Sequence, residues 1–479
     1  MGKVSKGFFW SAVDQFSVQG VSFILSIIIA RLVSPSAYGV VVMVQVFMSF
    51  AQLFIDGGFK SALIQKKDRT DEDFYTVFIF NMVVALILYA VMFVAAPFIA
   101  NFYNEPQLSS LTRVIALSLI FASFSLTQMV KIQATLNFKV QAKARLIATV
   151  LSGGVGVACA YKGMEAWALV IQGVLSQLLT SIFLMIFFKW MPRLVFSMES
   201  FKRLFSFGSK VLFGNFLTNC FMQVTNLVIG KVYSPAQLAY YNRGFTISQL
   251  PSANIMEVMG RTIYPIFCDL QGNKVELDVA FRKYLRLSCF AILPLVGILC
   301  ALAEPLIVVL LTDKWVETAP LLSLFCISFA TYPFLYICGN YSVALGFAGL
   351  NAKASVVKRV VSFVLLLAAL PISVTAIAVS LVIGSFFEML VNLWLVKKSG
   401  NISLTTQLSY VKDIVLVALL SAVASWFVMF LCANIYAQLF LGGIAGIIIF
   451  VFCMFLFNME EKNVLVDVVK KFVGNRKQK

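Results

Sequence analysis

The sequence predicts an all-α protein that crosses a membrane many times, and two properties of the whole chain lead to this fold class. Of its 479 residues, 61% are hydrophobic and only 12% are charged, whereas about 25% are charged in a typical soluble protein. The hydrophobic residues also form many continuous runs of about 20 residues, the length of a membrane-spanning helix. Membrane-spanning strands would instead alternate apolar and polar residues, so we expect a polytopic helical bundle.

The apolar runs place about 14 transmembrane helices along the chain. In order, we expect them at residues 8–30, 40–63, 74–100, 108–130, 144–161, 164–188, 208–231, 236–260, 284–303, 320–347, 354–372, 374–396, 413–433 and 437–457. Lys3 and Lys6 precede a first run that polar residues interrupt, and we interpret this run as a retained span rather than a cleaved signal. The two longest polar segments, 189–207 and 261–283, are expected to form short interfacial helices.

Basic residues predict the orientation of the chain. An even number of spans puts both termini on one side of the membrane, and 31 of the 38 Lys and Arg residues then lie on that side. Six lie on the opposite side, and Lys60 lies inside a span. Cytoplasmic loops of membrane proteins carry an excess of Lys and Arg, so we expect both termini in the cytoplasm. The same bias accounts for the net charge of +17, and no nucleic-acid partner is expected.

Two short patterns recur about 200 residues apart and indicate an internal repeat. The sequence ARLVSPSAYG at residues 30–39 returns in altered form as GKVYSPAQLAY at residues 230–240. The pairs LNF and AKA, at 136–138 and 142–144, return as LGF and AKA at 345–347 and 352–354. We therefore predict two equivalent six-helix lobes related by an axis along the membrane normal. Residues 1–200 form the N-terminal lobe and residues 201–400 the C-terminal lobe, and residues 401–479 add two further helices and a cytoplasmic tail.

Polar residues inside the predicted spans mark the candidate site. They recur at helical spacing in the first two spans of each repeat, so each set shares one helix face. The predicted cleft-lining residues are Gln45, Gln52, Asn215, Asn219, Gln223 and Asn254. One interpretation is a water-filled cleft between the two bundles, and the alternative is that these residues hold helices together through hydrogen bonds.

Three acidic residues in these spans, Asp14, Asp56 and Glu257, are candidates for ion coupling because a buried charge in a bilayer is costly. The alternative is a structural ion pair with Lys60 or Arg261, and Asp56 has the favourable i, i+4 spacing to Lys60. Glu388 and Asn392 form a further polar pair in the twelfth span. Arg31 and Lys231 lie on the side where basic residues are disfavoured, which suggests an anion-attracting mouth of the cleft.

Other chemistries find little support in the sequence. His is absent and the nine Cys are scattered singly without a C-x-x-C pair, so no metal site, disulfide or cofactor is expected. Thr70 and Asp73 have the spacing of a capping box at the start of the third span. The chain has neither the G-x-x-x-x-G-K-[ST] nor the G-x-S-x-G pattern, so a nucleotide-driven pump or a serine hydrolase is not expected.

Residues 31–39 and the block IDGGFKSALIQKK at residues 55–67 resemble bacterial polysaccharide-export flippases. These belong to the oligosaccharide-lipid branch of the multidrug/oligosaccharidyl-lipid/polysaccharide exporter superfamily, and the similarity is closest to the colanic-acid and teichuronic-acid exporter-like subgroup. The resemblance implies transport of an undecaprenyl-diphosphate-linked oligosaccharide from the cytoplasmic to the outer leaflet of the bacterial cytoplasmic membrane. It also implies alternating access driven by a proton or sodium gradient or by the membrane potential, with a polysaccharide polymerase as a further partner to test.

A cationic cavity for the diphosphate is also implied by the resemblance. By position its residues would be Arg31, Lys60, Arg113, Lys231 and Arg261, of which Arg31 alone lies in a matching motif. A multidrug exporter of the same superfamily is the main alternative, and acidic residues would then dominate the cleft. A membrane glycosyltransferase, polymerase or ligase is less favoured because every predicted outer loop is short, so we expect a transporter and not an enzyme. Transport of a peptidoglycan lipid precursor stays open.

Overall fold

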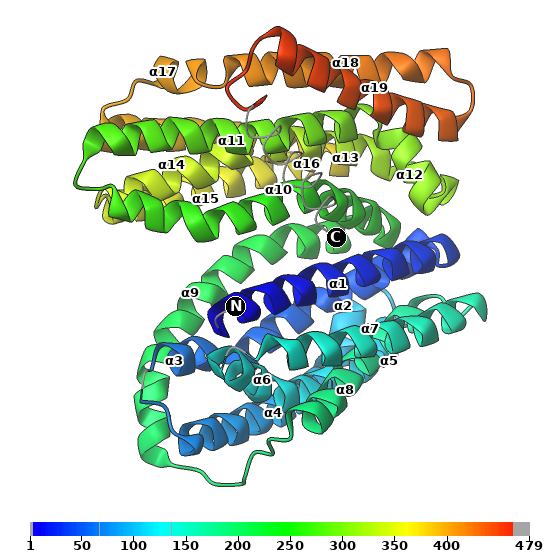
Figure 1. Cartoon of the computed structure of the whole chain (residues 1–479). Helices are drawn as coiled ribbons and strands as arrows, with labels where there is room; N and C mark the ends of the chain where they lie inside the picture. Colours follow the sequence, from blue (N-terminus) through cyan, green and yellow to red (C-terminus); the bar gives the residue numbers. More distant parts are fainter. Residues whose placement is uncertain (1–2, 67, 136, 463–479) are drawn as a thin grey trace, which may run out of the picture. The chain divides into compact units, whose positions relative to one another are not determined.

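The computed structural model describes residues 3–66, 68–135 and 137–462, without the side chains of residues 3–9, 11–13 and 261. These described residues form nineteen α-helices and one short 3-10 helix and contain no strand (Figure 1). Eleven helical stretches among them are long and apolar enough to cross a membrane. The other three predicted spans coincide with the helices α9 (Met198–Val232), α10 (Pro235–Asp269) and α15 (Ala348–Ala369), which carry more polar and charged side chains. The prediction of an all-α polytopic membrane protein is confirmed.

The chain divides into two compact units, Met1–Ala239 and Tyr240–Lys479. The helices of unit 1 are α1 (Lys3–Leu32), α2 (Pro35–Asp56), α3 (Phe59–Gln65), α4 (Asp71–Tyr103), α5 (Leu108–Ile115), α6 (Leu117–Thr135), α7 (Phe138–Tyr161), α8 (Ala166–Phe188) and α9 (Met198–Val232). The predicted lobe limits at residues 200 and 400 concern the sequence repeat and stay a prediction. In the structure α9, the counterpart of α1 in that repeat, packs within unit 1 against α2, α3 and α4.

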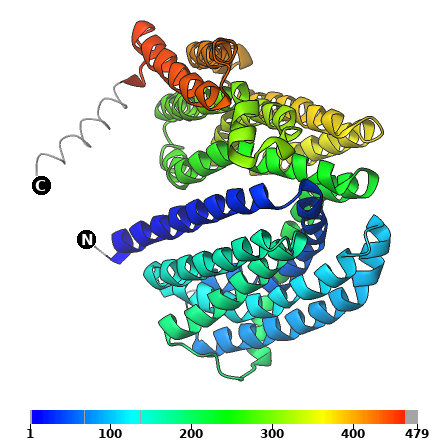
Figure 2. The same cartoon turned by 90° about the vertical axis from the view of Figure 1, so that its right-hand side faces the viewer.

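Most of unit 2 is also helical. It contains most of α10 (Pro235–Asp269), followed by α11 (Lys274–Ala301), α12 (Ala303–Leu311), η1 (Asp313–Trp315), α13 (Thr318–Phe329), α14 (Tyr332–Ala344), α15 (Ala348–Ala369), α16 (Val374–Gly400), α17 (Leu404–Ser409), α18 (Lys412–Leu431) and α19 (Ile435–Leu456). Helices α18 and α19 pack against each other, and both contact α11 (Figure 2). The part of the predicted tail from residue 463 onward lies outside the described residues.

The repeated Ser-Pro pattern is a helix start in both of its copies. Ser34 Oγ accepts a hydrogen bond from the Ala37 backbone N–H at 3.3 Å and Pro35 is the first residue of α2. Ser234 Oγ accepts in the same way from the Gln237 N–H at 3.3 Å. Ser at the N-cap followed by Pro is a favoured start because Pro lacks the N–H that the first turn leaves unpaired. The two copies therefore specify the same local structure.

The second predicted span is broken where the sequence predicted one continuous polar face. Gly57 and Gly58 have φ of 53° and 72° and separate α2 from α3. This left-handed conformation disfavours side chains, and a Cβ on Gly58 would lie 2.2 Å from the carbonyl oxygen of Gly208 in α9. Since the helix ends at Asp56, the expected i, i+4 geometry is lost, and no ion pair within 4.0 Å joins Asp56 to Lys60 in the described part of the chain.

The prediction of separate interfacial helices at 189–207 and 261–283 is wrong. Helix α9 runs without a break from Met198 into the membrane-spanning part, and α10 and α11 likewise extend to Asp269 and from Lys274. Within 261–283 the helices are interrupted at the turn 270–273, between α10 and α11, and Pro265 lies inside α10 without ending it.

The capping box at the start of α4 is confirmed. Thr70 Oγ1 accepts from the Asp73 N–H, and the Asp73 carboxylate accepts from the Thr70 N–H at 2.9 Å. Asp73 is fully buried and also binds Lys66 at 2.5 Å and Arg203 of α9 at 3.0 Å. The capping residue therefore ties the ends of α3, α4 and α9 together.

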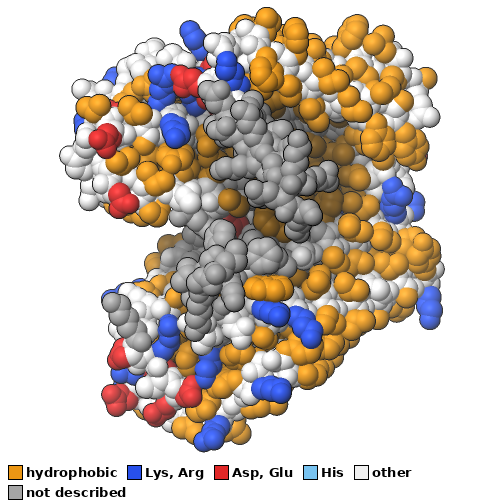
Figure 3. Space-filling model, in the orientation of Figure 1, with side chains coloured by type: hydrophobic (Ala, Val, Ile, Leu, Met, Phe, Trp, Pro, Cys, Tyr) orange, Lys and Arg blue, Asp and Glu red, His pale blue; other side chains and the backbone are white. Residues whose placement is uncertain are grey.

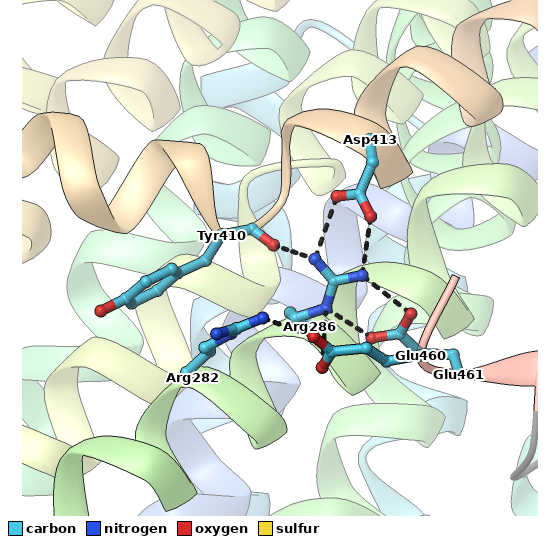
Figure 4. A network of polar contacts seen from close by, with 6 residues as sticks. All are labelled: Arg282, Arg286, Tyr410, Asp413, Glu460 and Glu461. Atoms are coloured by element: carbon cyan, nitrogen blue, oxygen red, sulfur yellow. Dashed lines mark hydrogen bonds and ion pairs between the residues drawn. The ribbon is translucent and has the colours of Figure 1, made fainter. Parts of the chain in front are cut away.

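On the face shown in Figure 3, apolar side chains cover much of the surface of the described residues, and most of the visible acidic side chains lie toward the left edge. One buried charge network ties the last helix pair of unit 2 to α11. The guanidinium of Arg286 donates to both carboxylate oxygens of Asp413, at 3.0 and 2.7 Å, and of Glu461, at 2.7 and 2.9 Å. Figure 4 shows these two carboxylates on adjacent edges of the guanidinium, with one terminal nitrogen bonded to both. The network joins the start of α18 and the chain after α19 to α11.

We predict that Gly58→Ala lowers the thermal unfolding temperature of the purified protein more than Gly163→Ala does. Both glycines have left-handed φ, of 72° and 73°, and the strained conformation costs an added side chain about 1–2 kcal/mol. Only at Gly58 would the Cβ also meet a backbone atom, because nothing lies within 4 Å of a Cβ at Gly163. Equal losses in the two variants would show that the contact with Gly208 is not tight.

We also predict that Arg286→Gln is far more destabilising than Arg282→Gln. Breaking a buried ion pair by removing one partner costs about 3–5 kcal/mol, and the side chain of Arg286 is 7% exposed. Arg282 pairs with Glu460 but is 46% exposed, and exposed pairs contribute about 1 kcal/mol or less. Thermal unfolding of the two detergent-solubilised variants checks the difference, and similar losses would contradict it.

Candidate functional site

Two adjoining cavities open along one face of α2 inside unit 1. The first has a volume of about 530 Å³ and lies between α2–α3, α6 and α9. The second, of about 420 Å³, lies between α2, α5, α6, α8 and α9. Ser49 and Gln52 of α2 line both cavities. The polar face of α2 is therefore the wall that the two cavities share.

Neutral amide side chains dominate the polar lining. The structure brings together five of the six predicted cleft-lining residues: Gln45, Gln52, Asn215, Asn219 and Gln223. Asn219 Nδ2 donates to Ser49 Oγ at 3.3 Å, which connects α9 to α2, and Asn226 Nδ2 donates to Gln223 Oε1 at 3.2 Å. Asn254 belongs to α10 in unit 2 and lines neither cavity.

The charges in the lining balance each other. Asp56 ends α2 and Lys60 lies in α3, and both line the first cavity. Lys60 is exposed, and Oδ1 of Asp56 is buried without a hydrogen-bond partner among the described residues. An acceptor without a partner in a polar cavity can take a hydrogen bond from a bound hydroxyl or from water. Of the four predicted cations whose side chains the structure describes, Lys60 is the one placed in this lining.

Two other predicted cations contact aromatic residues of α4, and Lys231 does so at the end of this helix. Arg113 of α5 lies over the ring of Phe93, with its guanidinium carbon 4.5 Å from the centroid, and its Nε donates to the Phe93 carbonyl at 3.4 Å. Lys231 donates to the carbonyl of Phe102, one residue before the end of α4, and lies 4.8 Å from that ring. A cation at a helix C-terminus is favoured by the exposed carbonyls and the helix dipole.

The remaining charged candidates lie elsewhere in the chain. Arg31 is exposed at the last turn of α1, and Glu257 is exposed in α10. The backbone of Arg261 lies in α10, but its side chain lies outside the described residues. None of these three lines either cavity.

Asp14 of α1 has a different partner from those that the sequence suggested. Its Oδ2 accepts from Arg145 and from Gln141, both of α7 and both at 2.9 Å. Asp14 is 5% exposed and the side chain of Arg145 is 36% exposed, so this ion pair between α1 and α7 is half-buried. The contact ties those two helices, and it lies apart from the two cavities.

Sequence reasoning missed two amides of the lining, Gln133 of α6 and Gln177 of α8. Gln177 lies in an apolar run that also holds Gln172 and Ser176, and amides inside a span were an available signal. Gln133 lies close to the end of its span, where polar residues are common and therefore do not indicate a cavity. A wall of amides, each with two donors and an acceptor, suits a ligand rich in hydroxyl and amide groups, such as a sugar.

Comparison with protein families matches residues 28–320 to the model described as polysaccharide biosynthesis protein. The chain is 26% identical to the teichuronic acid biosynthesis protein TuaB of Bacillus subtilis over 58% of each chain. It is 24% identical to the succinoglycan biosynthesis transport protein ExoT of Rhizobium meliloti, over 68% of this chain and 66% of that protein. The matched region thus spans about three-fifths to two-thirds of these relatives.

Two solved structures have a similar fold. The lipid II flippase MurJ in an inward closed conformation matches with a TM-score of 0.74 at 14% identity, over 96% of this chain and all of that one. An inward-facing multidrug resistance transporter of the MATE family matches with a TM-score of 0.59 at 13% identity, over 84% of this chain and 99% of that one. At these identities the likeness concerns the fold alone.

We predict that the cavities are in contact with water. In a background in which the nine free cysteines are replaced by Ser, Gln52→Cys and Asn219→Cys should react with a membrane-impermeant maleimide. The matched control is Val94→Cys, because Val94 is 66% exposed on the spanning helix α4 and would face lipid. Reaction of Val94→Cys as fast as that of the two cavity variants would contradict a water-filled cavity.

Proposed function

Because the chain belongs to the polysaccharide biosynthesis protein family, we propose that it is a transporter, and not an enzyme, that moves a lipid-linked oligosaccharide across a membrane. The observation that carries this proposal is the match to the family over residues 28–320, together with the amide-lined cavities inside unit 1. Relatives named for teichuronic acid biosynthesis and for succinoglycan transport support a sugar polymer precursor as the cargo.

In this proposal the cargo is an undecaprenyl-diphosphate-linked oligosaccharide that moves from the cytoplasmic to the outer leaflet of a bacterial cytoplasmic membrane. The chain alternates between inward-open and outward-open states, with both termini in the cytoplasm and with an ion gradient or the membrane potential as the driving force. A polysaccharide polymerase would take up the delivered repeat unit. The lipid tail stays in the bilayer, because burying it in a polar cavity would forfeit its apolar surroundings.

The sugar and the diphosphate have different ligands in the lining. Amides such as Gln52 and Asn219 would exchange hydrogen bonds with sugar hydroxyls, and Lys60 would attract the diphosphate as a point charge. Asp56, without a partner for Oδ1, would accept from a hydroxyl. Arg31, Arg113, Lys231 and Arg261 remain proposed ligands of the diphosphate at other stages of transport, and Asp14, Asp56 and Glu257 remain proposed for ion coupling.

The multidrug alternative is less favoured by the charge of the lining. An exporter of cationic drugs would need acidic side chains to outnumber basic ones, but Asp56 and Lys60 cancel each other here. The fold likeness to MurJ keeps a peptidoglycan lipid precursor as the second candidate cargo. It would be distinguished by complementation of a strain that lacks its own lipid II flippase.

We predict that Lys60→Gln abolishes surface polysaccharide in a bacterium whose own copy of the gene is deleted, while Lys60→Arg retains part of it. The Arg variant keeps the positive charge that the diphosphate needs, and the Gln variant does not. The control is Lys162→Gln, because Lys162 is exposed in the turn after α7 and lines neither cavity. Surface polysaccharide and membrane-inserted protein are measured together. Normal polysaccharide in cells with Lys60→Gln would contradict the role of Lys60.

A further inference from the structure

Two opposite charges lie on neighbouring helices of unit 2, one on α15, where the sequence predicts a span, and one on the candidate spanning helix α16. Lys358 lies 12 residues before Leu370 and Glu388 lies 14 residues after Val374, on either side of the short turn that joins α15 to α16. At 1.5 Å per residue these positions are about 18 Å and about 21 Å from the turn. Both therefore lie within a hydrocarbon layer about 30 Å thick, at similar depth.

The two charges are held loosely, each by a neutral side chain. Lys358 Nζ donates to Asn392 Oδ1 at 3.4 Å, and Glu388 Oε1 accepts from Ser362 Oγ, also at 3.4 Å. Asn392 is 1% exposed and is fixed by a 2.8 Å bond from its Nδ2 to the Glu388 carbonyl. Across the residues described, no ion pair within 4.0 Å joins Lys358 to Glu388.

The contrast with Arg286 shows that this arrangement differs from a structural ion pair. Arg286 has four charge-assisted bonds of 2.7 to 3.0 Å to two carboxylates, which hold its charge in place. Among the described residues, Glu388 accepts one long bond from a hydroxyl and none from a cation. An intramembrane carboxylate with such weak partners is neutralised at low cost when it takes up a proton.

Few other charged groups lie on the described helices that pack around Lys358 and Glu388. The charged groups that act on Glu388 are Lys358 and Arg359 of α15, and Lys358 also faces the thiol of Cys338 in α14. The described helices α13, α14 and α17, which also pack against α16, contain no Asp, Glu, Lys or Arg. Close packing keeps the pair in position, because a Cβ on Gly384 of α16 would lie 3.3 Å from Ser362 Oγ.

We propose that Glu388 is a proton-binding site that couples transport to a proton gradient, with Lys358 as the fixed positive charge beside it. The Glu388 carboxylate takes one proton from water on one side of the membrane and becomes a neutral carboxyl. It later releases the same proton to the other side, while the Lys358 ammonium stays protonated throughout. This inference rests on the proposed transport function, because the proton movement is assigned to the cycle that carries the oligosaccharide.

Proton binding is tested by infrared difference spectroscopy on the purified full-length protein in lipid vesicles between about pH 8 and about pH 5. The wild-type spectrum should contain the C=O stretch of a buried carboxyl that appears with acid. This component should be lost in Glu388→Gln and kept in Glu304→Gln, since Glu304 is an exposed carboxylate in the first turn of α12. In Lys358→Gln it should appear at higher pH. Superimposable spectra of wild type and Glu388→Gln would overturn the proposal.

Coupling is tested in the cells that report surface polysaccharide. Glu388→Gln should fall to the level of cells without the transporter, and Glu388→Asp, which keeps a carboxyl, should retain part of the export. If Glu388→Gln loses the infrared component but exports normally, the coupling role is overturned while the transport function stands. If the wild-type gene itself fails to restore export, the transport function is the part that fails. Thermal unfolding of each variant shows whether a loss of export is due to misfolding. If Glu388→Gln misfolds, the export measured for Glu388→Asp tests the coupling role instead.

Discussion

The hydrocarbon layer offers no hydrogen bonds, and this constraint determines where each polar residue of the chain can lie. In unit 1 it is met by gathering polar side chains on facing helices, so that Asn219 of α9 reaches Ser49 of α2. That meeting depends on the approach of Gly208 to Gly58, where neither residue has room for a side chain. The break in α2 therefore also brings the polar faces close enough to form the walls of a cavity.

The sequence predicted most features that depend on local pattern. Apolar runs set the number of spans, because their length is fixed by the thickness of the bilayer. Both Ser-Pro copies start helices and Thr70 caps α4, since an N-cap involves residues only two or three positions apart. The amides of α2 and α9 share cavities because helical spacing places them on one face. In each case the signal and the structure lie within a few turns of helix.

Contacts between distant residues could not be predicted in the same way. Asp14 pairs with Arg145, which is 131 residues away, and nothing in the pattern of either helix selects that partner. The end of α2 at Gly57 was missed as well, because glycine is common inside membrane helices and the need for positive φ comes from α9. Lys231 meets a helix end that only the folded chain brings near it. The Asp14–Arg145 pair, the end of α2 and the contact of Lys231 all depend on how distant helices pack together.

Charged residues on the helices of this chain differ in how fully their partners hold them, and this difference distinguishes the structural role of Arg286 from the roles proposed for Asp56 and Glu388. Arg286 is saturated by two carboxylates and so resists any change of state. Asp56 and Glu388 are under-partnered, which leaves them able to respond to a ligand or a proton. The balanced charge of the cavity follows the same logic. In the proposed transport cycle the cargo must be released as readily as it is bound, and distributed bonds from neutral amides meet that requirement better than a dense cluster of cations would.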